Sequence, residues 1–364
     1  MSGNSEKLSA GLRRQLEPFR EFLRADDVEE LFINRPGEVF VKTSSQTCRR
    51  LDMPDLTYDE LQALTVVAGN ARALRFDEGA PLLSTALPRD PAFIDCQLRF
   101  TAVRPPCVEP GYIIVALRKQ SLRDLTLSDL AGAGLFNGTT LRGRYDGADD
   151  RVGVELAAAG FEVVDVARRK RKRALPPVPG AAEAAAAGDA VRLLGLLVKA
   201  RRNIAISGAT GAGKTTVLNA CVREIPDGER FISIEDAREV RSLHANRVHL
   251  LSMASENASI AVTPRDLLKH TLRLSPQRIA LSEVRGAEAY PFLESVNTGH
   301  PGSLTTLHAD SIEDAKTRLA MAAARAFDGL RDEHMRQLVD EYVDVFVHIR
   351  AEPSGRFISD IEYV

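Results

Sequence analysis

Several common features are absent or sparse in this 364-residue sequence. It has no tryptophan, aromatic residues make up only 5%, and none of its four cysteines belongs to a C-x-x-C pair. Such scattered cysteines predict neither a zinc ribbon nor a disulfide framework. The formal net charge of −2 excludes a strong global attraction to nucleic acid or to an anionic membrane. Any strong functional signal must therefore be local.

Long apolar runs are also missing. The N-terminal residues include Glu6, Lys7, Arg13 and Arg14 and lack the apolar core of a secretory signal. The most apolar stretch, residues 181–200, is interrupted by four charged residues, which argues against a membrane span. We therefore expect a cytosolic protein.

Length and changes of pattern along the chain predict two domains joined by a linker. A domain usually has roughly 100 to 200 residues, so this chain is long enough for more than one. Residues 1–122 begin with a helical apolar pattern and continue with short β-like runs, which is typical of a small α+β domain. Residues 123–188 are rich in Gly and Ala and predict a long linker. Residues 189–364 alternate helices with apolar strands, which predicts a parallel sheet covered on both faces.

The boundaries of several elements can be predicted from turn and capping residues. Thr263 followed by Pro264 predicts a helix through Leu274, and Ser311 predicts the start of a helix that runs toward Phe327. The strands expected in the first domain cover residues 31–34, 39–42, 96–103 and 112–118.

The predicted linker contains six consecutive basic residues, 168–173, followed by a proline-rich segment. One interpretation is a solvated loop. The other is contact with acidic lipid headgroups or nucleic acid, although no aromatic residue interleaves with the run to stack on bases. The sequence leaves both interpretations open.

The strongest local signal is a phosphate-binding loop at residues 208–215. Residues 203–207 predict a buried strand that leads into G-x-x-x-x-G-K-T and then into a helix, as this motif requires. Backbone N–H groups of such a loop surround phosphate oxygens, Lys214 reaches the β- and γ-phosphates, and the Thr215 hydroxyl ligates Mg²⁺. The predicted nucleotide-binding residues are Gly208, Ala209, Thr210, Gly211, Ala212, Gly213, Lys214, Thr215 and Thr216.

Two carboxylates follow predicted strands downstream of this loop. Glu235 comes after a strand at residues 230–234, and Glu283 follows a strand at residues 278–281. Hydrolysis needs a group that orients or deprotonates water, and the carboxyl ends of parallel strands face the crevice in which ligands bind. Either carboxylate alone could be a solvated charge at a strand end. Two of them after a phosphate-binding loop favour a catalytic role.

Two histidines lie in the stretch 299–308. His308 closes a short predicted strand on the crevice side, where it is either a sensor of the γ-phosphate or an ordinary polar residue. His300 lies among prolines and glycines, and we expect it to shape the loop.

These motifs, in this order, resemble those of the secretion and pilus superfamily of hexameric traffic ATPases. Residues 208–215 look like its Walker A motif, 232–236 like its Asp box, 279–283 like its Walker B motif and 299–308 like its His box. Within the superfamily, the sequence is most similar to the VirB-type traffic ATPases of type IV secretion. Residues 33–39, the Leu98-Arg99 segment with Pro105-Pro106, and residues 115–119 resemble the N-terminal domain of that family.

The resemblance implies a RecA-like P-loop domain with a mainly parallel sheet, preceded by a smaller α+β N-terminal domain. It also implies ATP as substrate, Mg²⁺ as cofactor, and a homohexamer at the cytoplasmic face of the inner membrane. The hexamer would dock onto inner-membrane secretion components and would handle DNA or protein cargo indirectly. Separately, the basic run at residues 168–173 motivates the prediction of peripheral contact with the acidic face of the inner membrane.

The resemblance further implies roles for individual residues. Arg99 and Arg118 would reach the nucleotide from the N-terminal domain. Glu235 and Glu283 would serve Mg²⁺ and the attacking water, and which of them is the general base stays open. The implied catalytic residues are Lys214, Glu235, Glu283, His308, Arg99 and Arg118, and the implied metal ligands are Thr215 and Glu235.

Two positions depart from the usual pattern of the family. Ser282 replaces the glycine that usually precedes the Walker B glutamate, and Gln277 replaces a common aspartate, but neither change removes a catalytic group. A pilus-retraction or tight-adherence pilus motor is the alternative within the superfamily. A nucleotide-gated assembly scaffold and a helicase-like translocase are alternatives of other classes, and turnover measured with and without DNA separates them.

Overall fold

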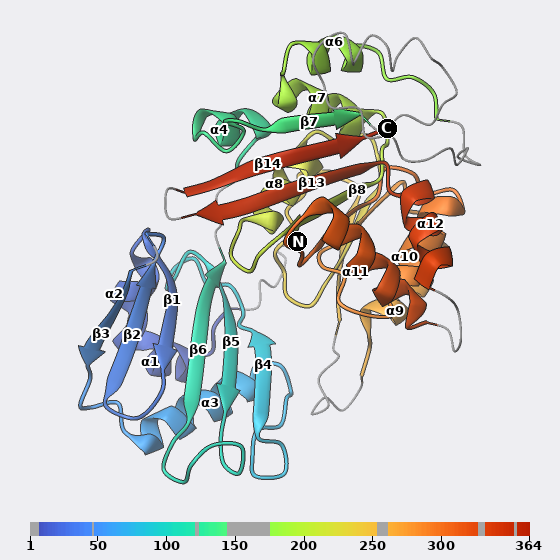
Figure 1. Ribbon diagram of the computed structural model, residues 1–364. Helices are drawn as coiled ribbons and strands as arrows, with labels where there is room; N and C mark the ends of the chain where they lie inside the picture. The colour runs from blue at the N-terminus through green and yellow to red at the C-terminus, as the bar shows by residue number, and fades with distance from the viewer. Residues whose placement is uncertain are drawn as a thin grey trace. The chain divides into compact units, whose positions relative to one another are not determined.

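The computed structural model describes residues 7–45, 47–120, 124–143, 175–252, 261–326, 332–352 and 355–364. The described chain forms two compact units that divide between residues 123 and 124, and the short segments 236–238 and 252–263 group with the first (Figure 1). Each unit has its own sheet and its own hydrophobic core. Every helix in the described residues is too short or too polar to cross a membrane.

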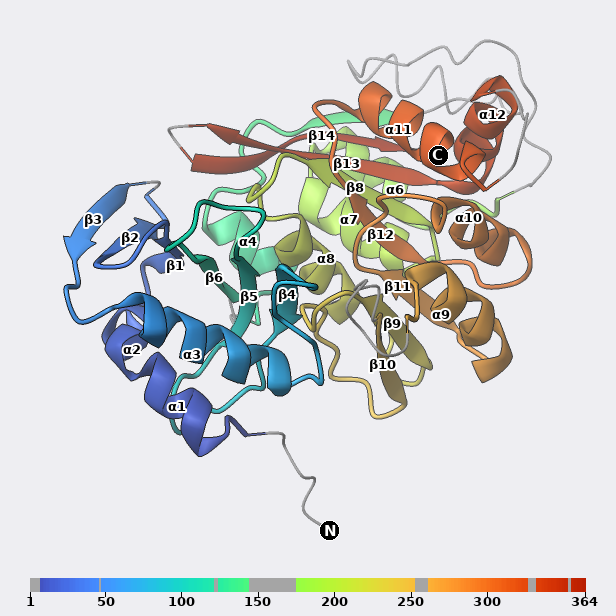
Figure 2. The same cartoon turned by 90° about the horizontal axis from the view of Figure 1, so that it is seen from below.

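The first unit is an antiparallel sheet with its core on one face. The strand order is β3-β2-β1-β6-β5-β4. Along β5, Leu98, Phe100 and Ala102 are buried, because alternate side chains of a strand point to the same face. This face packs against α1 and α3 (Figure 2). The elements are α1 (Ala10–Leu16), η1 (Glu17–Phe19), α2 (Arg20–Arg24), β1 (Val28–Ile33), β2 (Glu38–Thr43), β3 (Cys48–Asp52), α3 (Tyr58–Asn70), β4 (Leu82–Ala86), β5 (Gln97–Val103) and β6 (Ile114–Gln120).

The second unit contains an eight-stranded sheet in the order β10-β9-β11-β12-β8-β13-β14-β7. Only the β13–β14 pairing is antiparallel, so the sheet is mainly parallel, as predicted. The strands are β7 (Thr140–Gly143), β8 (Ile204–Gly208), β9 (Phe231–Glu235), β10 (Arg247–Leu251), β11 (Arg278–Leu281), β12 (Leu304–Leu307), β13 (Val345–Glu352) and β14 (Gly355–Tyr363). The helices are α4 (Leu127–Gly132), α6 (Ala181–Ala186), α7 (Ala190–Lys199), α8 (Lys214–Arg223), α9 (Pro264–Thr271), η2 (Leu272–Leu274), α10 (Ala289–Asn297), α11 (Ile312–Ala324) and α12 (Asp332–Tyr342).

Helices cover both faces of this sheet. On β8, Ile204 and Ile206 join the core formed with α7 and α8, whereas Ala205 joins the core formed with α9, α10, α11 and α12. All five residues of β8 are buried. A strand buried on both faces reads as a continuous apolar run rather than an alternating one, which is why residues 203–207 could be recognised in the sequence.

Part of the predicted linker belongs to the second unit. Within residues 123–188, Leu127 and Leu130 of α4 and Leu141 of β7 lie in the core of that unit, and α6 adds two buried alanines. Alanine-rich composition suggested a linker here, but small side chains also allow short helices to pack closely. Residues 144–174, which include the basic run, lie outside the described residues.

Most predicted boundaries fall close to the observed ones. The four strands expected in the first unit correspond to β1, β2, β5 and β6, and the strand expected at residues 278–281 is β11. The helix expected through Leu274 consists of α9 and η2. Ser311 caps α11, since its Oγ accepts a hydrogen bond from the backbone N of Asp314 at 3.0 Å. The expected end of that helix near Phe327 lies outside the described residues.

Candidate active site

The phosphate-binding loop connects β8 to α8 at the carboxyl edge of the parallel sheet. A Cβ at Gly208 would lie 2.5 Å from the carbonyl oxygen of Ile349, so only glycine fits between β8 and β13 here. Gly213 precedes α8 with φ of +99°, a left-handed conformation that glycine adopts at low cost. The first turn of α8 contains Lys214, Thr215 and Thr216, and its free N–H groups make a ready anion site.

Lys214 is buried within this loop and contacts a histidine from another strand. The residue is 7% exposed. Its Nζ donates hydrogen bonds to the carbonyl oxygens of Gly208 and Ala209, both at 2.9 Å, and to Nδ1 of His308 at 3.0 Å. An ammonium group has three donors, and these contacts use all three, so a bound phosphate would compete with them.

The order of the strands brings the predicted Walker A, Walker B and His-box residues together. β12 lies between β8 and β11, and all three are parallel, so their carboxyl ends share one edge. Nε2 of His308 lies 2.8 Å from Oε1 of Glu283. The other oxygen of Glu283, Oε2, accepts a hydrogen bond from Nη2 of Arg285 at 2.7 Å. Lys214, His308 and Glu283 therefore form one continuous line of contacts.

The pKa values in this line are shifted by burial and by neighbouring charge. The pKa of His308 is lowered, first by burial and then by the positive charge of Lys214. The ring is therefore neutral at pH 7, with Nδ1 as acceptor and the proton on Nε2. Burial acts to raise the pKa of Glu283, but Arg285, His308 and Lys214 outweigh it and lower that pKa. Glu283 is thus an anion at pH 7.

Glu235 is bound entirely by its own unit. Its Oε1 accepts a hydrogen bond from Oγ of Ser233 at 2.6 Å, and its Oε2 accepts from the backbone N of Glu239 and of Val240, both at 2.6 Å. The residue is 1% exposed. Both carboxylate oxygens of Glu235 are therefore occupied, one by Ser233 and the other by the backbone of the segment that follows β9.

Glu239 is the carboxylate that faces the phosphate-binding loop. Its Oε2 accepts a hydrogen bond from Oγ1 of Thr215 at 3.1 Å, and its carbonyl oxygen accepts one from Nδ2 of Asn219. Sequence analysis did not select this residue, because it lies in an irregular segment four residues after Glu235, where no periodicity predicts the direction of a side chain.

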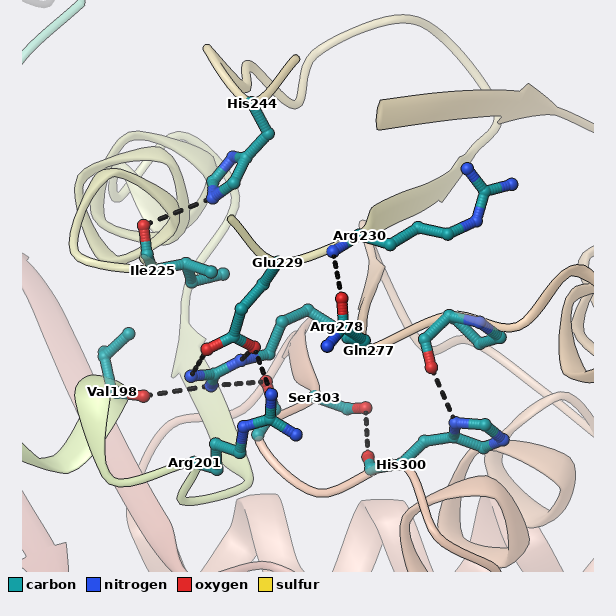
Figure 3. Close-up of polar contacts among 12 residues, drawn as sticks. Val198, Arg201, Ile225, Glu229, Arg230, His244, Gln277, Arg278, His300 and Ser303 are labelled. Atoms are coloured by element: carbon teal, nitrogen blue, oxygen red, sulfur yellow. Dashed lines mark hydrogen bonds and ion pairs between the residues drawn. The ribbon is translucent and has the colours of Figure 1, made fainter. Parts of the chain in front are cut away.

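His300 lies away from the line of contacts, at the opposite end of β12 from His308. Its Nδ1 donates to the carbonyl oxygen of Pro276 at 2.9 Å, and its own carbonyl accepts from Oγ of Ser303 (Figure 3). The expectation that His300 shapes its loop agrees with these contacts.

A buried ion pair lies near the same end of the sheet. Arg278 is fully buried and pairs with Glu229 through Nε at 2.7 Å and Nη2 at 3.2 Å (Figure 3). Arg201 also contacts Glu229, at 2.9 Å. Nη1 of Arg278 further donates to the carbonyl oxygens of Val198 and Gly302. This cluster joins β11 to the segments that precede β8 and β12.

Arg99 and Arg118 lie in the first unit. They are cross-strand partners on β5 and β6 and lie on the face away from the buried Leu98 and Phe100. Nε of Arg118 is 3.5 Å from Oε1 of Glu30 on β1. The structure brings the two arginines together on one surface.

The residues of the second unit fit a nucleotide with its divalent cation. Oε1 of Glu283 is buried and lies 2.8 Å from Nε2 of His308, but the N–H of that ring is poorly aligned with it for a hydrogen bond. An ion such as Mg²⁺ is usually held by one or two protein oxygens together with substrate phosphates and waters. The hydroxyl of Thr215 and the carboxylates of Glu239 and Glu283 supply oxygens of this kind.

Comparisons with known proteins identify the family of this chain. A family model described as "Type II/IV secretion system protein" matches residues 182–344. The type IV secretion system protein VirB11 of Brucella suis biovar 1 (strain 1330) is 34% identical, over 98% of this chain and 91% of that protein. The type IV secretion system protein PtlH of Bordetella pertussis (strain Tohama I / ATCC BAA-589 / NCTC 13251) is 31% identical, over 96% of this chain and 94% of that protein.

Similarity to a solved structure supports the fold. The crystal structure of the pilus retraction motor PilT with bound ADP has a TM-score of 0.57 and is 17% identical, over 96% of this chain and 82% of that one. The sequence identity to VirB11 over almost the full length of both proteins is the more specific finding. The chain belongs to the VirB11 family of type IV secretion ATPases.

Proposed function

We propose that this type IV secretion ATPase is the subunit of a homohexameric motor that couples ATP hydrolysis to substrate transfer or pilus assembly. The line of contacts from Lys214 through His308 to Glu283 carries the proposal, because it joins phosphate-binding, sensing and water-activating groups within one unit. The observation supports a hydrolytic site over a loop that only binds nucleotide.

In the proposed reaction, water attacks the γ-phosphorus of ATP. A bond forms between the water oxygen and phosphorus while the bond to the β,γ-bridging oxygen breaks, so ADP leaves with that electron pair. Glu283 is the best candidate to accept the water proton, because its Oε1 is buried and forms no well-aligned hydrogen bond within the described residues. Glu235 is a poor candidate, since both of its oxygens already accept hydrogen bonds.

Lys214 would neutralise charge on the β- and γ-phosphates after exchanging its present carbonyl partners for phosphate oxygens. Mg²⁺, when bound, would neutralise charge that develops on the phosphate oxygens. Thr215 and Glu239 would hold it, in place of the Thr215 and Glu235 pair that we expected from sequence. His308 would report the presence of the γ-phosphate to Glu283 and Lys214, which it contacts on its two sides.

We further propose that Arg99 and Arg118 contribute positive charge to bound ATP from the first domain, and that closure around the nucleotide converts hydrolysis into rigid-body motion. The proposed location is the cytoplasmic face of the inner membrane, beside other secretion components. We also propose that the first domain ends near residue 122.

The decisive experiment combines ATP turnover with oligomer mass for wild type, Glu283→Gln, Glu239→Gln and Glu235→Gln. We expect a hexamer in which Glu283→Gln lowers kcat about 100-fold or more while ATP still binds. Glu239→Gln should mainly raise the Mg²⁺ concentration needed for half-maximal turnover. A wild-type oligomer that binds ATP without turnover would contradict the motor and favour the nucleotide-gated scaffold. Turnover that depends on DNA would favour the translocase.

Membrane contact through the basic run is tested separately. If residues 168–173 bind acidic headgroups, changing all six to glutamine should abolish sedimentation with vesicles that contain anionic lipid. Vesicles of neutral lipid are the control. Unchanged sedimentation with anionic vesicles would refute this contact without affecting the enzymatic assignment.

A further inference from the structure

Glu235 is held by three donors that approach it from two directions. Ser233 lies two residues earlier on β9, so its side chain points to the same face of the sheet, and its Oγ is 2.6 Å from Oε1 of Glu235. On the other side, Oε2 accepts from the backbone N of Glu239 and of Val240. Because the carboxylate is almost fully buried, these hydrogen bonds determine its orientation.

His249 completes this arrangement from the neighbouring strand. It is directly opposite Ser233 in the pairing of β10 with β9, and its Nδ1 lies 2.6 Å from Oγ of Ser233. The single hydroxyl proton of Ser233 is already donated to Glu235. Nδ1 of His249 must therefore carry the proton and donate it to Ser233. The imidazole side chain is only 8% exposed and packs edge-on against the ring of Phe231.

The hydrogen bonds continue from Glu235 to the phosphate-binding loop. Glu239, whose backbone N is held by Glu235, accepts the hydroxyl hydrogen of Thr215 through Oε2 at 3.1 Å. The irregular segment after β9 has no ladder hydrogen bonds to fix it at this point. Asn219 holds the carbonyl oxygen of Glu239 and the backbone N of Arg241, and Glu235 holds two amides of the same segment. Glu235 and Asn219 together therefore set where the Glu239 carboxylate lies relative to Thr215.

We propose that Ser233 and His249 are positioning residues for the magnesium side of the ATP site. They orient Glu235, and Glu235 in turn fixes the backbone that carries Glu239 to Thr215. The inference rests on the proposed function and deepens it, since it names residues that act on the site without touching nucleotide. Residues that orient metal ligands in this way typically change metal affinity or activity 10–100-fold when they are replaced.

Paired substitutions test the hydrogen bonds one at a time. Ser233→Ala removes the donor to Glu235, and we expect the Mg²⁺ concentration for half-maximal turnover to rise about tenfold or more. Affinity for a fluorescent ATP analogue in EDTA should stay unchanged, because the phosphate-binding loop keeps its own contacts. Ser233→Thr retains the hydroxyl and should restore the Mg²⁺ dependence. His249→Leu should behave as Ser233→Ala, whereas His249→Asn keeps an N–H donor near Nδ1 and should resemble wild type.

A matched control separates positioning from general loss of packing. Ser295 on α10 is as fully buried as Ser233, and its Oγ donates to the carbonyl oxygen of Phe292 at 2.7 Å. Ser295→Ala therefore also deletes a buried hydroxyl, but away from the site. We expect it to lower the melting temperature without changing the Mg²⁺ dependence. Equal Mg²⁺ dependence in Ser233→Ala and Ser295→Ala would overturn the proposal.

A double variant tests the route of the effect. If Ser233 acts through Glu239, Ser233→Ala should add nothing to the loss of Mg²⁺-dependent ATP affinity already caused by Glu239→Gln. Full additivity would overturn the proposed route. Lys214→Ala keeps the two hypotheses apart: wild-type turnover in this variant would refute the ATP site itself. Loss of turnover there, combined with unchanged Mg²⁺ dependence in Ser233→Ala, would refute only the positioning role.

Discussion

Nζ of Lys214 donates a hydrogen bond to Nδ1 of His308 at 3.0 Å, although the two residues are 94 positions apart in the sequence. The contact is possible because β12 pairs directly with β8 and both strands end at the same edge. The protonation state of the His308 ring therefore depends on Lys214, the residue that would bind phosphate.

The first prediction concerns the pH dependence of turnover. The pKa of His308 is lowered below its ordinary value of 6.5 by burial and by Lys214. Protonation at low pH would place a donor at Nδ1 opposite the ammonium of Lys214 and break their hydrogen bond. We therefore expect kcat/KM to be constant above pH 6.5 and to fall as the pH drops below that value.

His308→Gln tests this assignment. The variant should lose about 100-fold in kcat and should lack the acid limb, which a profile of kcat/KM from pH 5 to 8 would reveal. Glu283 does not contribute in this range, since its pKa is lowered below 4.5. An acid limb that persists unchanged in His308→Gln would assign it to another group.

The second prediction concerns the pH dependence of stability. His348 on β13 is buried behind the phosphate-binding loop, where its Nδ1 lies 2.9 Å from Oγ of Ser207. Burial lowers its pKa below 6.5 in the folded state. The unfolded chain therefore binds a proton before the folded one does as the pH falls. Stability should be full above pH 6.5 and should decrease below it, by at most about 1.4 kcal/mol per pH unit for this one group.

Melting temperatures between pH 7.5 and 5.5 check the contribution of His348. The decrease should be smaller in His348→Gln than in wild type, even though the variant is less stable at pH 7.5. His308→Gln is measured beside it, because the pKa of that histidine is lowered too. Identical slopes in wild type and His348→Gln would contradict the prediction.

The third prediction concerns the buried ion pair of Arg278 with Glu229. Arg278→Ala removes the main partner of the Glu229 carboxylate. Because a buried charge without its partner is costly, we expect the free energy of unfolding to fall by about 3–5 kcal/mol. Arg201→Ala removes a guanidinium that is 39% exposed, so it should cost about 1 kcal/mol or less. Urea denaturation measures both. Similar losses in the two variants would show that burial does not decide the strength of these contacts.

The fourth prediction concerns the arginines of the first unit. If Arg99 and Arg118 make charge-assisted hydrogen bonds to bound ATP, Arg99→Ala and Arg118→Ala should each lower kcat/KM about tenfold or more. Arg50→Ala on β3 is the control, since its ion pair with Glu38 is in the same sheet. Steady-state kinetics with circular dichroism as a check of folding distinguishes the cases. Wild-type kcat/KM in both variants would exclude the proposed role.

Sequence reasoning succeeded where one local pattern decides the structure. The strand-loop-helix around Lys214 and the fully buried strand β11 are of this kind. A run of apolar residues that ends in a glycine-rich turn or a carboxylate specifies both the strand and its exposed end. The mainly parallel sheet followed from the alternation of such strands with helices.

Local sequence patterns do not predict the features that long-range contacts decide. The family resemblance implied Glu235 as a Mg²⁺ ligand, whereas in the structure Ser233 and two backbone amides donate to its oxygens, and Glu239 accepts from Thr215. Nothing in the local sequence indicates that Ser233 and His249 face each other, since this depends on the register of β10 with β9. The same limit applies to the predicted linker, whose strand β7 has its pairing partner far along the chain.

That pairing constrains the order in which the protein can fold during synthesis. β7 pairs with β14, and Thr139 and Ile358, which hydrogen bond beside it, are 219 residues apart. A ribosome completes β7 long before β14 exists, so this edge of the sheet cannot close while the intervening residues are still being made. All strands of the first unit lie within residues 28–120. This unit can therefore assemble its sheet much earlier.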